Sequence, residues 1–261
     1  MSRGAPVGSD DPTRDTHGMS DGPSPTKAAP KSRRSTKRTE PITAEAIVDT
    51  AFRLIEERGP EGFSMRAVAS EVGGFPANLY WHVGDRAQLI NLVEQRWIES
   101  VELPDDDLGW REWLTELAHR FRANAHRHPN VTRLMSLERA SSSGSLALPD
   151  AVLGRLAGLG LGDDLVHAYN ALIGGTLGFV VMELARVGDP GSESALAAES
   201  DLRNLDAERF PHASAHFDDL ADRAFSLRWT DASQRPLDES FAYFIELMLD
   251  GLTMRLGRRS D

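Results

Sequence analysis

The chain has 261 residues, 40% of them hydrophobic, and its formal net charge is −11 at pH 7. This length allows one large or two modest domains. A charge this negative argues against a protein coated in nucleic acid, so any DNA contact must come from a local basic feature. The sequence has no cysteine, which excludes disulfides and thiolate metal sites and fits a cytoplasmic protein. No apolar run reaches about 18 residues, and no apolar stretch follows the charged N-terminus, so we expect neither a membrane span nor a secretory signal.

Residues 1–40 are expected to be a disordered basic arm, because they are rich in Gly, Pro, Ser and Thr and hold too few apolar residues to form a core. Six cations crowd into twelve residues of this arm: Lys27, Lys31, Arg33, Arg34, Lys37 and Arg38. Residues 41–100 behind it carry nine acidic side chains against five arginines. The arm could therefore supply phosphate or minor-groove contacts. The alternative is a passive solubilising tail or an added expression segment.

The first helix is predicted over Thr43–Glu57, with Thr43 as its N-cap and Gly59 after its end. Its apolar positions recur at helical spacing and predict one buried face. They are Ile47, Val48, Ala51, Phe52, Leu54 and Ile55.

Two short helices joined by a glycine turn are predicted in Ser64–Arg86. Ser64 can accept a backbone N–H as N-cap, and Gly73–Gly74 can adopt the positive φ that ends a helix. Pro76 suits the first position of the next helix, which Gly84 stops. This arrangement is typical of a helix-turn-helix, in which the second helix enters the major groove.

Further helices are predicted along the rest of the chain, and no strand-like alternation persists, so we expect an all-α protein. Their ranges are 86–100, 108–127, 130–139, 149–158, 163–187, 212–225 and 236–255. Residues 141–145 are expected to be a flexible joint and 188–209 a loop, because both are rich in helix-breaking residues.

Two of these late helices are more apolar than one core requires. The segment 163–187 carries small residues at helical spacing (Ala171, Gly174, Gly175 and Gly178), which permit close approach of another helix. The segment 236–255 is apolar almost all round, which predicts burial on both sides. We expect both helices to form the interface of a homodimer around a two-fold axis.

The motifs MRAVASEVG and LYWHV, followed by a basic residue, resemble the TetR family of bacterial transcriptional regulators, and the tetracycline repressor branch in particular. The resemblance is strongest over Ala44–Val101, with a weaker echo in Arg209–His212 and Phe241–Leu252. It implies a helix-turn-helix domain at residues 41–101 and an effector-binding and dimerisation domain at 102–261. It also implies a repressor that binds a palindromic operator and is released by a small molecule.

The resemblance assigns DNA contacts to the second helix of the helix-turn-helix, here called the reading helix, and to residues beside it. These residues are Arg66, Pro76, Ala77, Asn78, Tyr80, Trp81, His82 and Arg86. Asn78 can pair with adenine and Arg66 with guanine, whereas Tyr80, His82 and Arg86 are expected to hold phosphates. The helix departs from the tetracycline repressor between Phe75 and Asn78, so the operator sequence is not carried over.

Candidate effector contacts were chosen as large or polar side chains on inward-facing helices. They are Trp113, Phe121, Met135, Tyr169, Asn170, Phe179 and Met182. We expect no metal or other cofactor. His119 and His126 lie about 10 Å apart along one helix, and Val131–Glu138 lacks the histidine that the tetracycline repressor associates with magnesium. Two alternatives stay open: a regulator controlled by a protein partner, and a small-molecule enzyme, although no catalytic spacing stands out.

Overall fold

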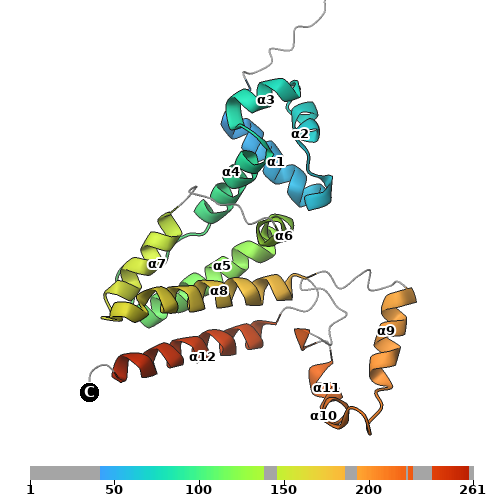
Figure 1. Ribbon diagram of the computed structural model, residues 1–261, viewed down its shortest axis with the longest axis vertical. Coiled ribbons are helices and arrows are strands. Elements are labelled where there is room, and N and C mark those ends of the chain that lie inside the picture. The colour runs from blue at the N-terminus through green and yellow to red at the C-terminus, as the bar shows by residue number, and fades with distance from the viewer. Residues whose placement is uncertain (1–41, 138–145, 186–192, 222, 226–236, 259–261) are drawn as a thin grey trace, which may run out of the picture. The chain divides into compact units, whose positions relative to one another are not determined.

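The computed structural model describes residues 42–137, 146–185, 193–221, 223–225 and 237–258. Every regular element in these ranges is a helix, which confirms the predicted all-α class. The predicted basic arm and the joint at 141–145 lie outside the described residues. Figure 1 shows the helices in chain order.

The first four helices begin and end close to the predicted positions. They are α1 (Ala44–Arg58), α2 (Met65–Glu71), α3 (Pro76–Val83) and α4 (Arg86–Glu99). Three of them have a side-chain N-cap: Thr43, Ser64 and Asp85 accept the N–H groups of Ala46, Ala67 and Gln88. Such caps satisfy backbone donors that a helix cannot satisfy within itself, and each contributes about 1 kcal/mol.

Glycines set the turns on either side of α3. Gly73 (φ 72°) and Gly84 (φ 70°) both adopt left-handed backbone conformations that side chains with a Cβ avoid. α1, α2 and α3 pack together, and α4 returns along α1. The predicted helix-turn-helix is therefore present, with α3 as its second helix.

The larger helical part follows α4. Its helices are α5 (Trp110–Arg127), α6 (Pro129–Leu137), α7 (Ala147–Ala157), α8 (Leu165–Glu183), α9 (Glu193–Arg203), α10 (Pro211–Ala215), α11 (Phe217–Leu220) and α12 (Asp238–Gly257). Two predictions were wrong. Part of the expected loop 188–209 is α9, because the run from Glu193 to Arg203 holds strong helix formers after the last proline and glycine. The single helix expected over 212–225 is divided into α10 and α11 at His216.

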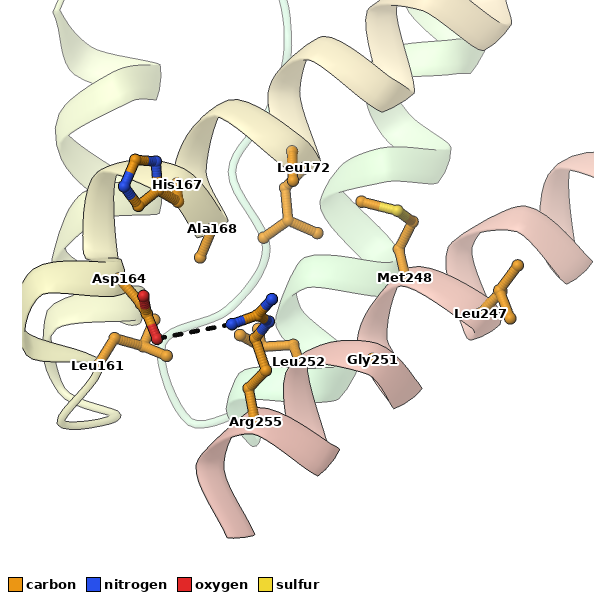
Figure 2. Close-up of a pocket in the computed structure, with 11 residues that line it drawn as sticks. Leu161, Asp164, His167, Ala168, Leu172, Leu247, Met248, Gly251, Leu252 and Arg255 are labelled. Atoms are coloured by element: carbon orange, nitrogen blue, oxygen red, sulfur yellow. Dashed lines mark ion pairs between the residues drawn. The ribbon is translucent and has the colours of Figure 1, made fainter. Parts of the chain in front are cut away.

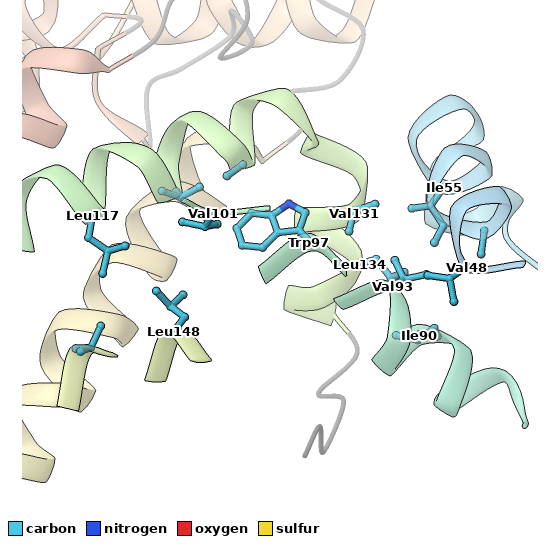
Figure 3. Close-up of a cluster of buried hydrophobic side chains, with 14 of the residues drawn as sticks. Val48, Ile55, Ile90, Val93, Trp97, Val101, Leu117, Val131, Leu134 and Leu148 are labelled. Atoms are coloured by element: carbon cyan, nitrogen blue, oxygen red, sulfur yellow. The ribbon is translucent and has the colours of Figure 1, made fainter. Parts of the chain in front are cut away.

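α4 joins the two parts of the fold through one continuous set of buried side chains (Figure 3). Ile90 and Val93 lie near the middle of α4 and belong to the same cluster as Val48 of α1. In its second half, Trp97 is fully buried and meets the Phe121 ring of α5 edge-on at 5.0 Å. A movement of α4 must therefore disturb both parts.

α8 and α12 lie side by side (Figure 1). They approach closely at Gly175, since a Cβ there would lie 2.9 Å from Cζ of Phe244. Gly174 and Gly178 face open space instead. Residues 162–183 are long and apolar enough to cross a membrane by length and composition alone. One helix of this kind is weak evidence for a membrane span, and α8 packs on α5, α7 and α12 of the same chain.

Candidate nucleic-acid interface and internal cavity

α3 has one buried side and one exposed side. Leu79 and Val83 are buried in the three-helix core. Tyr80 is 52% exposed and Trp81 90% exposed, which is unusual for such large apolar side chains. An exposed apolar group of this kind commonly marks an interaction site.

The structure places the eight predicted DNA-contact residues on α2, α3 and the first residue of α4. Seven are exposed and Pro76 is half-buried. The Arg86 guanidinium stands 5.3 Å from the centre of the Phe63 ring, which gives its stem a fixed support. Whether these residues touch DNA stays a prediction.

Most arginines of the first four helices are paired with carboxylates. Arg53 contacts Glu57 at 3.0 Å and Glu71 at 2.9 Å, and Arg96 contacts Asp49 at 2.8 Å. Arg58 also reaches Glu71. These pairs are exposed, and they offset part of the positive charge on the surface of the first four helices.

An internal cavity of about 190 Å³ lies among α4, α5, α6, α7, α8 and α12. Its lining is mainly aliphatic and aromatic. The side chains that line it are Glu94, Ile98, Leu114, Leu117, Ala118, Phe121, Met135, Leu148, Pro149, Val152, Tyr169, Leu172, Ile173, Thr176, Leu177, Ile245 and Leu249. Three predicted effector contacts, Phe121, Met135 and Tyr169, are among them.

The other four predicted effector contacts lie away from this cavity. Trp113 is buried, donates its indole N–H to the Pro104 carbonyl at 3.2 Å and lies under Arg155. Phe179 packs against the rings of α12, and Asn170 and Met182 are exposed. All four stay predictions. α8, which carries three of them, is apolar on more than one side, so its spacing alone did not show which side faces the cavity.

The helical spacing of α8 did contain the missing signal. Tyr169, Leu172, Ile173 and Thr176 follow one another at i, i+3, i+4 and i+7, and all four line the cavity. Burial raises the pKa of the Tyr169 hydroxyl, so this group stays a neutral donor and acceptor.

A buried ionic cluster joins α5, α8 and the start of α12. The Arg122 guanidinium donates to both Glu183 carboxylate oxygens at 2.8 and 2.7 Å and to Asp238 at 2.7 Å. Glu183 also accepts the Leu237 N–H at 2.8 Å and lies 3.0 Å from Nε2 of His126. Burial alone would raise the pKa of Glu183, but these hydrogen bonds hold it well below its usual range.

His119 and His126, considered above as metal ligands, and their neighbour His128 each make a structural contact. His126 joins the Glu183 carboxylate, His119 lies edge-on to Phe241, and His128 lies edge-on to Phe52. Among the described residues, no three or more metal-ligating side chains come together.

Glu56 of α1 links the first three helices to α6. Its carboxylate accepts the Val131 N–H at 2.6 Å, and its backbone carbonyl accepts from the Asn130 amide at 2.7 Å. Glu56 thus serves as a distant cap for the first turn of α6, the helix that carries Met135 of the cavity lining.

Removing this distant cap by Glu56→Ala is expected to lower the free energy of unfolding by about 1 kcal/mol. Glu56→Gln keeps an acceptor oxygen but removes the charge. Burial raises the pKa of Glu56 despite its hydrogen bonds, so the folded chain holds this proton more tightly than the unfolded chain. The contribution of Glu56 to the free energy of unfolding therefore falls as pH rises above the ordinary carboxylate range. The stability of E56Q should accordingly rise relative to that of the wild type from pH 5 to pH 8. Urea denaturation curves with parallel pH profiles would contradict this account.

Three capped helices with α3 exposed beside them, followed by a cavity-containing helical part, define an all-α fold of the helix-turn-helix class. The family described as bacterial regulatory proteins, tetR family, matches residues 47–93, and the tetracyclin repressor-like C-terminal domain matches residues 103–256. The chain therefore belongs to the TetR family, as its motifs had indicated, and is a DNA-binding transcriptional regulator.

Individual relatives agree with this membership. The chain is 29% identical over 194 residues to an HTH-type transcriptional regulator of Saccharopolyspora erythraea, covering 69% of this chain and 82% of that one. Its fold is similar to that of apo ActR from Streptomyces coelicolor (TM-score 0.66, 24% identity, 84% and 98% covered). It is also similar to BioQ crystallised with its double-stranded DNA operator (TM-score 0.51, 26% identity, 56% and 90% covered).

Proposed function

We propose that this regulator is a cytoplasmic repressor that binds a palindromic operator as a homodimer and leaves it when an apolar small molecule enters the internal cavity. The observation that carries the proposal is the position of α4. Its first residue, Arg86, belongs to the predicted DNA surface, whereas Glu94 and Ile98 line the cavity. One helix therefore belongs to both sites.

A ligand in the cavity would act by population shift. It presses on α4 through Ile98 and on α6 through Met135, and both helices contact α1 of the DNA-binding part. Two reading helices in a dimer must stand about 34–36 Å apart to enter successive major grooves. A ligand that binds better to a dimer with another spacing lowers the fraction that fits the operator.

The lining indicates the chemistry of the effector. Aliphatic and aromatic side chains dominate, and the Tyr169 and Thr176 hydroxyls offer a few polar contacts. These features suit a largely apolar molecule with a small number of hydrogen-bonding groups. ActR, which has a similar fold, has been crystallised in complex with actinorhodin, and this supports a ligand-binding regulator. The cavity favours a small molecule over control by a protein partner, and we propose no catalytic step.

The dimer surface is proposed on α8 and α12. Their outer sides expose apolar groups that one chain leaves uncovered: Val166, Met182, Tyr243, Leu247 and Met254. A groove of about 370 Å³ runs between the two helices (Figure 2). A second copy of the chain offers the same groove and the same projecting side chains, as a two-fold contact requires.

The DNA surface is tested by two substitutions with different expected readouts. Asn78→Ala should relax base preference at one position of each half-site and remove about 1–3 kcal/mol of discrimination. Arg86→Ala should weaken binding to all sequences alike and reduce the salt slope by about one per site. Binding would be measured on an operator selected from random duplexes. Unchanged affinity and preference in N78A would show that α3 is placed wrongly.

The cavity is tested by filling it. Ala118 lies on α5 and lines the cavity. Ala118→Leu should leave operator affinity unchanged. It should raise the effector concentration needed to release the protein from the operator at least about tenfold. The probes are apolar compounds that release the wild-type protein from its operator in a screen. Ala123→Leu, at an exposed position of the same helix, is the matched control. Equal release of A118L and the wild type would exclude this cavity as the effector site.

A further inference from the structure

Phe75 occupies the N-cap position of the reading helix, yet it cannot cap it. Its backbone is extended (φ −98°, ψ 147°) and its side chain makes no capping hydrogen bond. α1, α2 and α4 each have a Thr, Ser or Asp at the equivalent position with the capping bond formed. α3 therefore lacks a stabilising contact of about 1 kcal/mol that its three neighbours have.

Packing does not explain this phenylalanine either. The Phe75 side chain is 77% exposed, whereas Phe63 of the same domain is buried in the core. An aromatic ring left in water forgoes the free energy that burial would supply. Among the described residues, the position thus contributes to neither the cap nor the core, and its exposed ring is available to a partner.

The helix-turn-helix class places this ring where bases are read. In this motif the N-terminal residues of the second helix contact base edges in the major groove. Phe75, Pro76 and Ala77 lead α3, and their side chains carry no hydrogen-bonding group. The apolar feature of the major groove is the C5-methyl group of thymine, which Phe and Ala side chains are suited to contact.

We propose that Phe75 is a specificity-determining residue that reads the methyl group of one thymine in each operator half-site. The proposal rests on the DNA-binding function but assigns a contact that neither the motif resemblance nor the relatives supply. The helix-turn-helix then makes two kinds of base contact through α3 and its N-cap: Phe75 selects thymine by apolar contact, and Asn78 selects its base by hydrogen bonds.

The test removes the methyl groups from the DNA. Each thymine of the selected operator is replaced in turn by deoxyuridine, which keeps base pairing and lacks only the C5-methyl. At one position per half-site we expect about a fourfold loss of wild-type affinity, the value for one buried methyl-sized group. When both half-sites are changed, the loss should be about 15-fold.

Phe75→Ala and Phe75→Ser identify the side chain responsible. Both variants should bind thymine and deoxyuridine operators equally at that position. Phe75→Ser should also raise the melting temperature, because it restores a capping hydroxyl, so lost thymine preference in a more stable protein cannot come from misfolding. Phe210→Ala, at another exposed phenylalanine, should keep the preference.

Two results would overturn the proposal. One is a wild-type protein whose affinity stays the same when any thymine methyl group is removed, although it still binds its operator selectively. The other is a thymine preference that survives in both Phe75 variants. Neither affects the proposed function itself, which fails only if the wild-type protein selects no operator.

Discussion

Replacing Arg122 by alanine is expected to lower the free energy of unfolding by about 3–5 kcal/mol, because Glu183 would stay buried without its main charge partner. The Glu183 side chain is completely inaccessible to water, and Arg122 is its bidentate partner. The same guanidinium reaches Asp238 and lies 5.0 Å from the centre of the Phe241 ring. One substitution therefore removes an ionic link from α5 to both α8 and α12. Urea denaturation followed by circular dichroism measures the loss.

Arg111→Ala is the matched control for this prediction. Arg111 also joins α5 to α12, through Asp250 at 2.6 Å, but that pair is exposed. Exposed ion pairs contribute about 0–1 kcal/mol, so R111A should stay close to the wild type. Equal losses in R122A and R111A would show that burial does not govern the cluster.

Acid should weaken the same cluster. The pKa of Glu183 is depressed in the folded chain, so its contribution is present above the ordinary carboxylate range and is lost as pH falls below it. R122A should lose less stability than the wild type between pH 5 and pH 3.

A glutamate at Leu247 or Gly178 is expected to dissociate the proposed dimer and abolish tight operator binding. Leu247 is 59% exposed on α12, and a Cβ at Gly178 of α8 would meet no atom within 4 Å among the described residues, its own helix backbone aside. The monomer should therefore tolerate either change. In a two-fold interface each new charge approaches its own copy, and such like-charge contacts cost several kcal/mol. Sedimentation at micromolar concentration and operator titration measure the two effects.

Controls separate association from folding. Ala147→Glu adds a charge at an exposed position in the first turn of α7 and should leave the dimer intact. Gly175→Ala should lower the melting temperature of each chain, since its methyl group would press on the Phe244 ring. A wild-type protein that sediments as a monomer yet binds a palindrome tightly would refute the dimer.

Local chemistry was readable from the sequence. Thr43 and Ser64 were identified as caps, Gly84 as a stop and Pro76 as a helix start, because each acts on backbone groups within about four residues of itself. The same reasoning found the all-α class, the helix-turn-helix and the limits of most helices. It missed α9 because the glycines and proline before Glu193 were taken as evidence for a loop that also covered the helix formers after Glu193.

Tertiary structure decided which sides of those helices meet. Periodicity shows that a helix has an apolar side, but α8 is apolar on several sides. Only its packing against α5 and α12 distinguishes Tyr169, which lines the cavity, from Met182, which is exposed. The pairing of Arg122 with Glu183 joins residues 61 positions apart in the chain. No local pattern encodes such a contact, because its energy depends on desolvation and on the three-dimensional approach of distant helices.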